Sequence, residues 1–317
     1  MVLNALLFLT GLVILYYGAE WLIRGASSLA LQYGIRPIVV GLTVVALGTS
    51  MPEFLVNSIA AVSGEPDLAL GNIIGSNISN IALILGCSAL VLPIAVTPKI
   101  LRQEYPIMLA VMVLFYVLSL DGIISRWNGL LLVAVLVVIG VFLFFDERNA
   151  ESLVDEMEDD LQAGDPEDTA SSKTFHLVGG TAGLALGAHL MVDSALDIAN
   201  AMGIEHVVVG LTIVAIGTSL PELAASMVGA LKNEADLSVG NVLGSNLLNV
   251  LFVVGIVSSI TPLDVEPTSL AIHFPVMLGF CLLLLPIAWT HYRISRLEGG
   301  VLLVGFIGYM SYLVLYA

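Results

Sequence analysis

The 317-residue sequence contains few charged residues and very few basic ones. Charged residues make up 11% of the chain, against about 25% in a typical soluble domain. Hydrophobic residues make up 58%, and the mean hydropathy is +1.01. A soluble protein of this length and composition would have too little polar surface. The composition therefore excludes a soluble globular domain and predicts an integral membrane protein.

Basic residues and cysteines are both scarce. Ten Lys and Arg stand against 26 Asp and Glu, and no basic patch of the kind that attracts nucleic acid is present. Cys87 and Cys281 both lie in apolar segments, where we expect buried small residues without redox information. Membrane barrel strands would show runs of about ten residues that alternate between apolar and polar. The apolar runs in this sequence are long, so we expect spanning helices.

These apolar runs predict an all-α polytopic membrane protein with ten transmembrane helices. The expected spans are residues 1–23, 37–62, 68–96, 105–120, 128–145, 175–201, 206–231, 237–263, 270–290 and 300–317. Most reach the ~20 residues that cross ~30 Å of hydrocarbon, although the fourth and fifth are short. No basic residue precedes the first run and no cleavage site is obvious, so we interpret it as a retained helix and not a signal peptide.

Lys and Arg predict the orientation of these spans. With the N-terminus outside, nine of the ten basic residues fall on the cytoplasmic side and only Arg126 on the other, in agreement with the positive-inside rule. The nine are Arg24, Arg36, Lys99, Arg102, Arg148, Lys173, Lys232, Arg293 and Arg296. The sequence therefore predicts a multi-pass protein of the cell membrane with both termini extracytoplasmic.

One long polar stretch, residues 146–173, separates a first transmembrane half (1–145) from a second (174–317). Its eleven acidic and two basic residues give a net charge of −9 out of −16 for the chain. We expect a solvated, partly disordered cytoplasmic linker. A role in Ca²⁺ sensing stays open, although the stretch lacks the ligand spacing and the final Glu of an EF-hand loop.

The two halves contain an internal repeat. Residues 41–86 align without a gap on residues 210–255, always with an offset of 169, and 21 of the 46 pairs are identical. Each half has five expected spans, an odd number, so the second half must cross the membrane upside down relative to the first. Two inverted five-helix repeats are a transporter architecture, with substrate bound near the midplane between the halves.

A carboxylate lies in the middle of a span in both copies: Glu53 in GTSMPE and Glu222 in GTSLPE. Each charge costs about 2.5–3.5 kcal/mol at the bilayer centre, so an intramembrane carboxylate indicates a functional site. The preceding proline predicts either an ordinary kink or a broken helix whose carbonyls, hydroxyls and carboxylate form an all-oxygen cation site. Such oxygens suit Ca²⁺. His176 and His189 have no counterparts in the first half, and no His or Cys cluster favours zinc, copper or iron.

The second repeated motif is GNIIGSNISN in the third span and GNVLGSNLLN in the eighth. Its glycines have the GxxxG spacing that permits close helix approach. Ser76 and Asn80, like Ser245 and Asn249, are four residues apart and share one helix face. These side chains either hold helices together or complete an ion site beside the glutamates, and we favour the ion site.

Taken as a pair, the two motifs resemble the α-1 and α-2 repeats of the cation/calcium exchanger superfamily, and most closely its prokaryotic sodium/calcium exchangers. The resemblance covers both repeats, the ten-helix layout and the central cytoplasmic loop. It implies cation sites between the second, third, seventh and eighth helices, with the first and sixth helices sliding to switch access. Transported Ca²⁺ and Na⁺ are then substrates, and no cofactor is expected.

The resemblance also implies roles for individual residues. Glu53 and Glu222 would be the central ligands shared between Ca²⁺ and Na⁺, and Thr49 and Thr218 would contribute to the Ca²⁺ site. Backbone carbonyls, flanking hydroxyls and central amides would complete the set: Ala46, Ala215, Ser50, Ser219, Ser76, Ser245, Asn80 and Asn249. Some family members carry Asp where this chain has Asn249, including potassium-dependent exchangers, so we do not expect K⁺ co-transport.

The resulting hypothesis is a secondary antiporter that exchanges Ca²⁺ for Na⁺ by alternating access. A Ca²⁺/H⁺ antiporter of the same fold is the main alternative, with the two glutamates as proton acceptors. A cation channel and a membrane-embedded hydrolase are further alternatives, but inverted repeats favour alternating access and no nucleophile–base pair favours an enzyme. The expected partners are the two ions and the lipid bilayer, with no nucleic acid and no obligatory protein partner.

Overall fold

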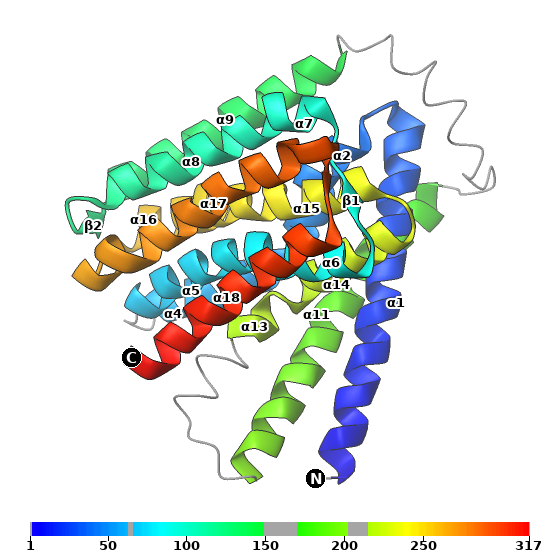
Figure 1. The fold of residues 1–317 in the computed structure, drawn as a ribbon, viewed down its shortest axis with the longest axis horizontal. Helices are drawn as coiled ribbons and strands as arrows, with labels where there is room; N and C mark the ends of the chain where they lie inside the picture. The colour runs from blue at the N-terminus through cyan, green and yellow to red at the C-terminus, as the bar shows by residue number, and fades with distance from the viewer. Residues whose placement is uncertain (1, 63–65, 149–169, 202–214, 317) are drawn as a thin grey trace.

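A computed structural model describes residues 2–62, 66–148, 170–201 and 215–316 (Figure 1). Helices make up nearly all of this part, with four two-residue strands at their ends. Most of the acidic linker (149–169) and the first residues of the second repeat (210–214) lie outside the described residues.

The first half begins with one long helix, α1 (Val2–Tyr33). The two motif segments follow as interrupted helices: α2 (Pro37–Val40), η1 (Gly41–Val45), α3 (Ala46–Thr49), α4 (Met51–Val62), α5 (Pro66–Ser79), η2 (Asn80–Ile84) and α6 (Leu85–Val91). The half ends with β1 (Ile94–Ala95), α7 (Pro98–Arg102), α8 (Glu104–Ser119), β2 (Ile123–Ile124) and α9 (Arg126–Arg148). The interruptions from α2 to α6 fall in the motif segments, and one further break, at Gln103, separates α7 from α8.

The second half follows the same order. It begins with α11 (Ala170–Ala201), which starts inside the segment assigned to the linker. The motif segments are α13 (Ala215–Thr218), α14 (Leu220–Leu231), α15 (Ala235–Leu248), η5 (Asn249–Val254) and α16 (Gly255–Ile260). The half ends with β3 (Leu263–Asp264), η6 (Ser269–His273), α17 (Phe274–Trp289), η7 (Thr290–Tyr292), β4 (Arg293–Ile294) and α18 (Arg296–Tyr316).

Seven helices in the described ranges are long and apolar enough to cross a membrane. The bent pair Pro37–Thr49 and Met51–Val62 would make eight if it counts as one span. The expectation of a helical polytopic membrane protein is therefore confirmed. The count of ten spans and the inverted arrangement stay predictions, since the seventh expected span (206–231) begins outside the described residues.

Elements of the two halves recur at the offset of the sequence repeat, and several pack against the other half. The starts of α4 and η2 recur as the starts of α14 and η5, each 169 residues later. Strand β1 pairs with β4 and β2 pairs with β3, both antiparallel, so each short sheet joins the two halves. Helix α6 packs on α18, and its counterpart α16 packs on α9.

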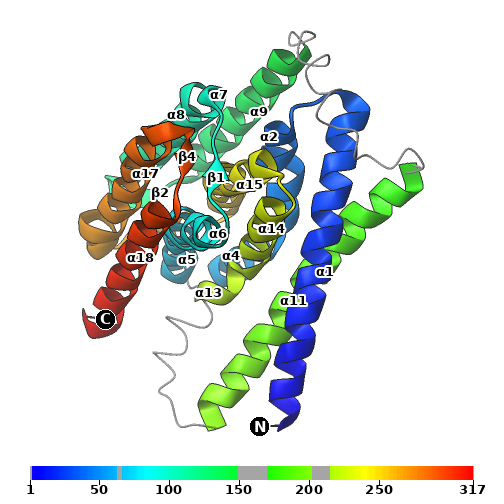
Figure 2. The same cartoon turned by 45° about the vertical axis from the view of Figure 1, so that its right-hand side comes forward.

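Helices α1 and α11 lie side by side and pack mainly against each other (Figure 2). Glycines allow their backbones to approach closely. A Cβ built on Gly180 would lie 2.5 Å from the Leu22 nitrogen, and one on Gly187 would lie 2.6 Å from the Leu15 nitrogen. Facing glycines of α1, including Gly18, are equally crowded by α11. The pair therefore depends on small residues, as membrane helices in close contact commonly do.

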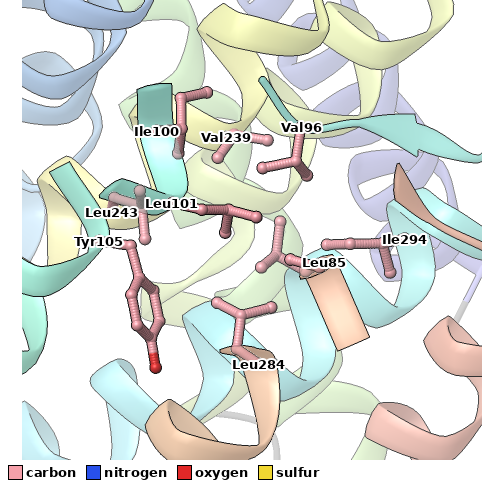
Figure 3. A pocket seen from close by; sticks show the side chains of 10 residues that line it. Leu85, Val96, Ile100, Leu101, Tyr105, Val239, Leu243, Leu284 and Ile294 are labelled. Atoms are coloured by element: carbon pink, nitrogen blue, oxygen red, sulfur yellow. The ribbon is translucent and has the colours of Figure 1, made fainter. Parts of the chain in front are cut away.

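Helix α8 packs on α7, α15 and α17. Figure 3 shows a small apolar cavity there, lined by residues that include Tyr105, Leu243 and Leu284. Its free volume is about 10 Å³, at the limit for one water molecule, so it is packing space and no substrate site. Nearby, Arg36 and Glu104 form a buried ion pair with 2.9 Å between Nη1 and Oε1. This pair ties the start of α2 to α8.

The glycine contact between α1 and α11 leads to a prediction on stability. Gly180→Ala would place a methyl group against the α1 backbone, and we expect a loss of about 1–3 kcal/mol because overpacking forces the helices apart. Gly140→Ala in α9 is the matched control, since nothing lies within 4 Å of its Cβ position. The midpoints of thermal unfolding in detergent measure both changes. Equal midpoints for the two variants would contradict the close packing.

Candidate functional site

The helix that carries Glu53 is broken two residues before the proline. Helix α3 ends at Thr49, Ser50 has φ −86° and ψ 3°, and α4 begins at Met51. The segments on either side are bent by 48°. The second half has the same break at Ser219, with φ −90° and ψ 4°. Since Pro52 and Pro221 have no N–H to donate, the hydrogen-bond ladder is interrupted in both copies. Of the two sequence-based alternatives, the structure has the broken helix.

Glu53 and Glu222 lie in the first turns of α4 and α14, directly after these breaks. Both are 1% exposed. Their carboxyl groups are close enough to interact with each other, although the residues are far apart in sequence. The Ser50 hydroxyl donates to Glu222 Oε1 at 3.1 Å. The structure thus brings the two acids of the repeat together at one place.

Thr49 and Ala46 lie on the first-half side of the site. The Thr49 hydroxyl lies 3.1 Å from Asn241 Oδ1 and 3.2 Å from the Ala46 carbonyl oxygen. The Ala46 carbonyl also accepts the Ser50 N–H at 2.9 Å, whereas the Thr49 hydroxyl has one proton to share between its two neighbours. In the second half, Ala215 and Thr218 are the first and last residues of α13.

The predicted serine and asparagine residues lie at the ends of regular helix. Ser76 belongs to α5 and Ser245 to α15, while Asn80 and Asn249 each begin a π-helical turn. All four are buried. π-Helical turns inside α-helices occur frequently at functional sites. The turn that carries Asn80 packs on α14, and the turn that carries Asn249 packs on α4, so each faces the glutamate helix of the other half.

Most of the predicted site residues share an unusual property. Each has a buried side-chain oxygen with no hydrogen-bond partner in the described part of the protein: Glu53 Oε2, Glu222 Oε2, Ser76 Oγ, Ser245 Oγ, Ser219 Oγ, Asn80 Oδ1 and Asn249 Oδ1. Two further such oxygens, on Ser88 and Glu104, belong to residues outside the predicted set. A buried polar atom without a partner costs about 1–3 kcal/mol, so this concentration requires an explanation.

The structure adds residues that the sequence interpretation missed. Asn241 donates to the Glu222 carbonyl oxygen at 3.2 Å and to Ser226 Oγ at 2.9 Å. In the first half, Asn57 donates to the Glu53 carbonyl oxygen at 2.7 Å and accepts from Asn72 at 3.2 Å. These side chains hold the backbone at both glutamates.

A sequence signal for two of these residues was present. Asn72 and Asn241 are identical at the repeat offset, as the first asparagines of GNIIGSN and GNVLGSN. An asparagine is not costly enough in a helix to stand out, unlike a carboxylate. The two histidines of the sixth span, in contrast, lie on α11. His189 is 3.3 Å from Asp193 and largely exposed, and His176 contacts Ser172.

The candidate metal-ligand atoms of this site are all oxygens. Within the described ranges, no group of three or more His, Cys, Asp and Glu side chains could hold a metal ion. The two carboxylates are instead surrounded by hydroxyl and amide oxygens. Hard cations such as Ca²⁺, which take oxygen ligands from carboxylates and carbonyls, suit these donors.

Comparison with known proteins agrees with this chemistry. The family model described as sodium/calcium exchanger protein matches residues 3–145 and 172–315. The putative antiporter CaxA of Alkalimonas amylolytica is 39% identical, with 98% of each chain covered. The sodium/calcium exchanger MaX1 of Methanosarcina acetivorans is 31% identical, with 97% of each covered.

A solved structure is similar over the whole chain as well. The sodium-calcium exchanger NCX_Mj superimposes with a TM-score of 0.82 and 32% identity, covering 98% of this chain and 99% of that one. This similarity and the family match together show a multi-pass membrane ion exchanger fold and not an enzyme fold. The chain belongs to the sodium/calcium exchanger family.

Proposed function

We propose that this protein is a secondary antiporter that exchanges Ca²⁺ for Na⁺ across the membrane by alternating access. The observation that carries the proposal is the set of buried oxygens without hydrogen-bond partners, contributed by both halves around two adjacent carboxylates. Cations bound there would supply the missing partners. Relatives described as sodium/calcium exchangers support Ca²⁺ and Na⁺ as the ions.

The two glutamates are the central ligands in this proposal and are shared between the two ions. Thr49 and Thr218 contribute to the Ca²⁺ position, and hydroxyls and amides serve the flanking Na⁺ positions: Ser50, Ser219, Ser76, Ser245, Asn80 and Asn249. The backbone carbonyls of Ala46 and Ala215 are assigned as further ligands of the cation site. The Ala46 carbonyl accepts the Ser50 N–H, and an ion would occupy its second lone pair.

Obligatory exchange follows from the charge of the site. Two buried carboxylates are neutralised by one Ca²⁺ or by more than one Na⁺, and the same ligands do not hold both loads at once. A loaded site can pass through a closed intermediate, whereas an empty site would bury two uncompensated charges. Ion binding therefore selects the closed state, and the empty protein resists the transition.

The architecture in this proposal is ten spans in two inverted repeats. Both termini lie outside the cytoplasm, and the acidic linker lies inside. The elements that recur at an offset of 169 and the strand pairs between halves support the repeat. Helices α1 and α11, which contact each other closely through glycine backbones, would slide across the site to switch access.

The two acidic side chains of the site support a second candidate function, that of a Ca²⁺/H⁺ antiporter. Two adjacent buried carboxylates can share a proton in place of a metal ion. The hydroxyl and amide oxygens around them favour Na⁺, since protons need no such ligands. Asn249, in place of the Asp found in potassium-dependent relatives of the superfamily, favours transport without K⁺.

We expect Glu53→Gln and Glu222→Gln to abolish coupled Ca²⁺ flux, because each removes one of the two charges that balance Ca²⁺. The measurement is Na⁺-gradient-driven Ca²⁺ uptake into proteoliposomes. Glu266→Gln is the matched control, since Glu266 is exposed between β3 and η6, and it should transport at nearly the wild-type rate. Unimpaired uptake by either glutamate variant would contradict the ligand assignment.

We further expect a Na⁺ gradient to drive Ca²⁺ uptake when no pH gradient is present. Parallel vesicles with an imposed pH gradient and no Na⁺ should take up little Ca²⁺, because a proton occupies none of the flanking oxygen ligands. Uptake driven by the pH gradient alone and indifferent to Na⁺ would favour the Ca²⁺/H⁺ antiporter instead.

A further inference from the structure

Two asparagines of the repeated GSN sequence have no role in the proposed ligand set. Asn77 and Asn246 are separated by the repeat offset of 169, and both are completely buried. Each contacts an asparagine of the other half. Asn80 Nδ2 donates to Asn246 Oδ1 at 3.0 Å, and Asn249 Nδ2 donates to Asn77 Oδ1 at 3.3 Å. The same contact therefore occurs twice, once in each direction between the halves.

A methionine sulfur lies at the far end of each contact. Asn246 Nδ2 lies 3.7 Å from Met108 Sδ, and Asn77 Nδ2 lies 3.9 Å from Met277 Sδ. Met108 and Met277 are also separated by 169 residues. A thioether sulfur accepts hydrogen bonds and never donates them. The amide group next to each sulfur is therefore the NH₂ group, and the amide oxygen points to the other end.

The orientation of each of these amides determines the orientation of the neighbouring amide. Because the oxygens of Asn77 and Asn246 accept, they require the NH₂ groups of Asn249 and Asn80. The oxygens Asn80 Oδ1 and Asn249 Oδ1 are then left without protein partners. In each copy, every amide therefore donates toward the methionine, and the outermost group of the series is the oxygen of Asn80 or Asn249 and not an NH₂ group.

We propose that Asn77 and Asn246, backed by Met277 and Met108, are positioning residues that fix the amides of Asn249 and Asn80 with their oxygens toward the transported cations. The inference rests on the proposed function. An amide turned by half a rotation would present two N–H donors to a cation, and the site would lose a ligand. The chain of hydrogen bonds prevents this rotation, and each half orients the ligand of the other.

A purely structural role for these asparagines gives a different expectation. If Asn246 only holds helices together, its loss should weaken the protein to the same degree whatever residue occupies position 80. If it acts through the Asn80 amide, its loss should matter only while an amide is present there. Aspartate at position 80 offers an oxygen in either orientation, so it makes the positioning residue unnecessary.

The test is equilibrium binding of radiolabelled Ca²⁺ to the purified full-length protein, which does not depend on the coupling ion. We expect Asn246→Leu to weaken Ca²⁺ binding about tenfold, since a misplaced amide replaces an acceptor with a donor. In an Asn80→Asp background, the same change should weaken binding less than twofold. Equal losses in the two backgrounds would overturn the inference.

A second comparison avoids any change of asparagine. Met108→Leu removes only the sulfur acceptor and should weaken Ca²⁺ binding several-fold, because Asn246 can then turn. Met112→Leu is its matched control, one turn further along α8 and equally buried, and should leave binding unchanged. Identical Ca²⁺ affinities for the two methionine variants would contradict the role of Met108 in orienting Asn246. Absence of Ca²⁺ binding by the wild-type protein would overturn the proposed function, and this inference with it.

Discussion

The main physical constraint on this structure is a group of oxygen atoms that are buried in a low-dielectric interior without hydrogen-bond partners. Seven such oxygens belong to the proposed site, and two of them are carboxylate oxygens. An uncompensated buried charge destabilises a protein by several kcal/mol, so these groups persist only if something else satisfies them during function. The fold contributes by interrupting its helices there: α3 and α13 end four residues before the glutamates, and η2 and η5 begin at Asn80 and Asn249, the proposed ligands. The irregular backbone lies where it lines the site, which is where a membrane protein tolerates it.

The polar network around the site has hydrogen bonds within each half and further hydrogen bonds that join the two halves. Ser50 donates to Glu222, Thr49 contacts Asn241, and the asparagine pairs connect the third helical segment of one half with that of the other. The short strand pairs at the helix ends also join opposite halves. An ion held between the halves would therefore contact both of them, and its charge would be balanced by one carboxylate from each.

The two longest helices have a different relation to the site. Helices α1 and α11 contact each other through glycine backbones and stand beside the central bundle (Figure 2). The pair also packs against this bundle through a buried cluster that includes Leu22 of α1, Leu184 of α11 and Val228 of α14. The central helices are joined to one another by buried hydrogen bonds and by the Arg36–Glu104 ion pair. The proposed sliding motion would therefore exchange the contacts between the pair and the bundle while the central hydrogen bonds stay in place.

Composition and residue pattern alone predict the membrane environment, the helical class, the repeat and the two buried acids. They can do so because these features depend on composition, on periodicity and on the high cost of a carboxylate in an apolar segment, all of which are local properties. Which polar side chains meet, in contrast, depends on how the chain folds. Asn246 contacts Asn80 and Met108 across 166 and 138 residues, and the break at Ser50 replaces the simple kink that proline also permits. A neutral amide costs too little to reveal its role from sequence, and its hydrogen-bond direction depends on neighbours that only folding brings together.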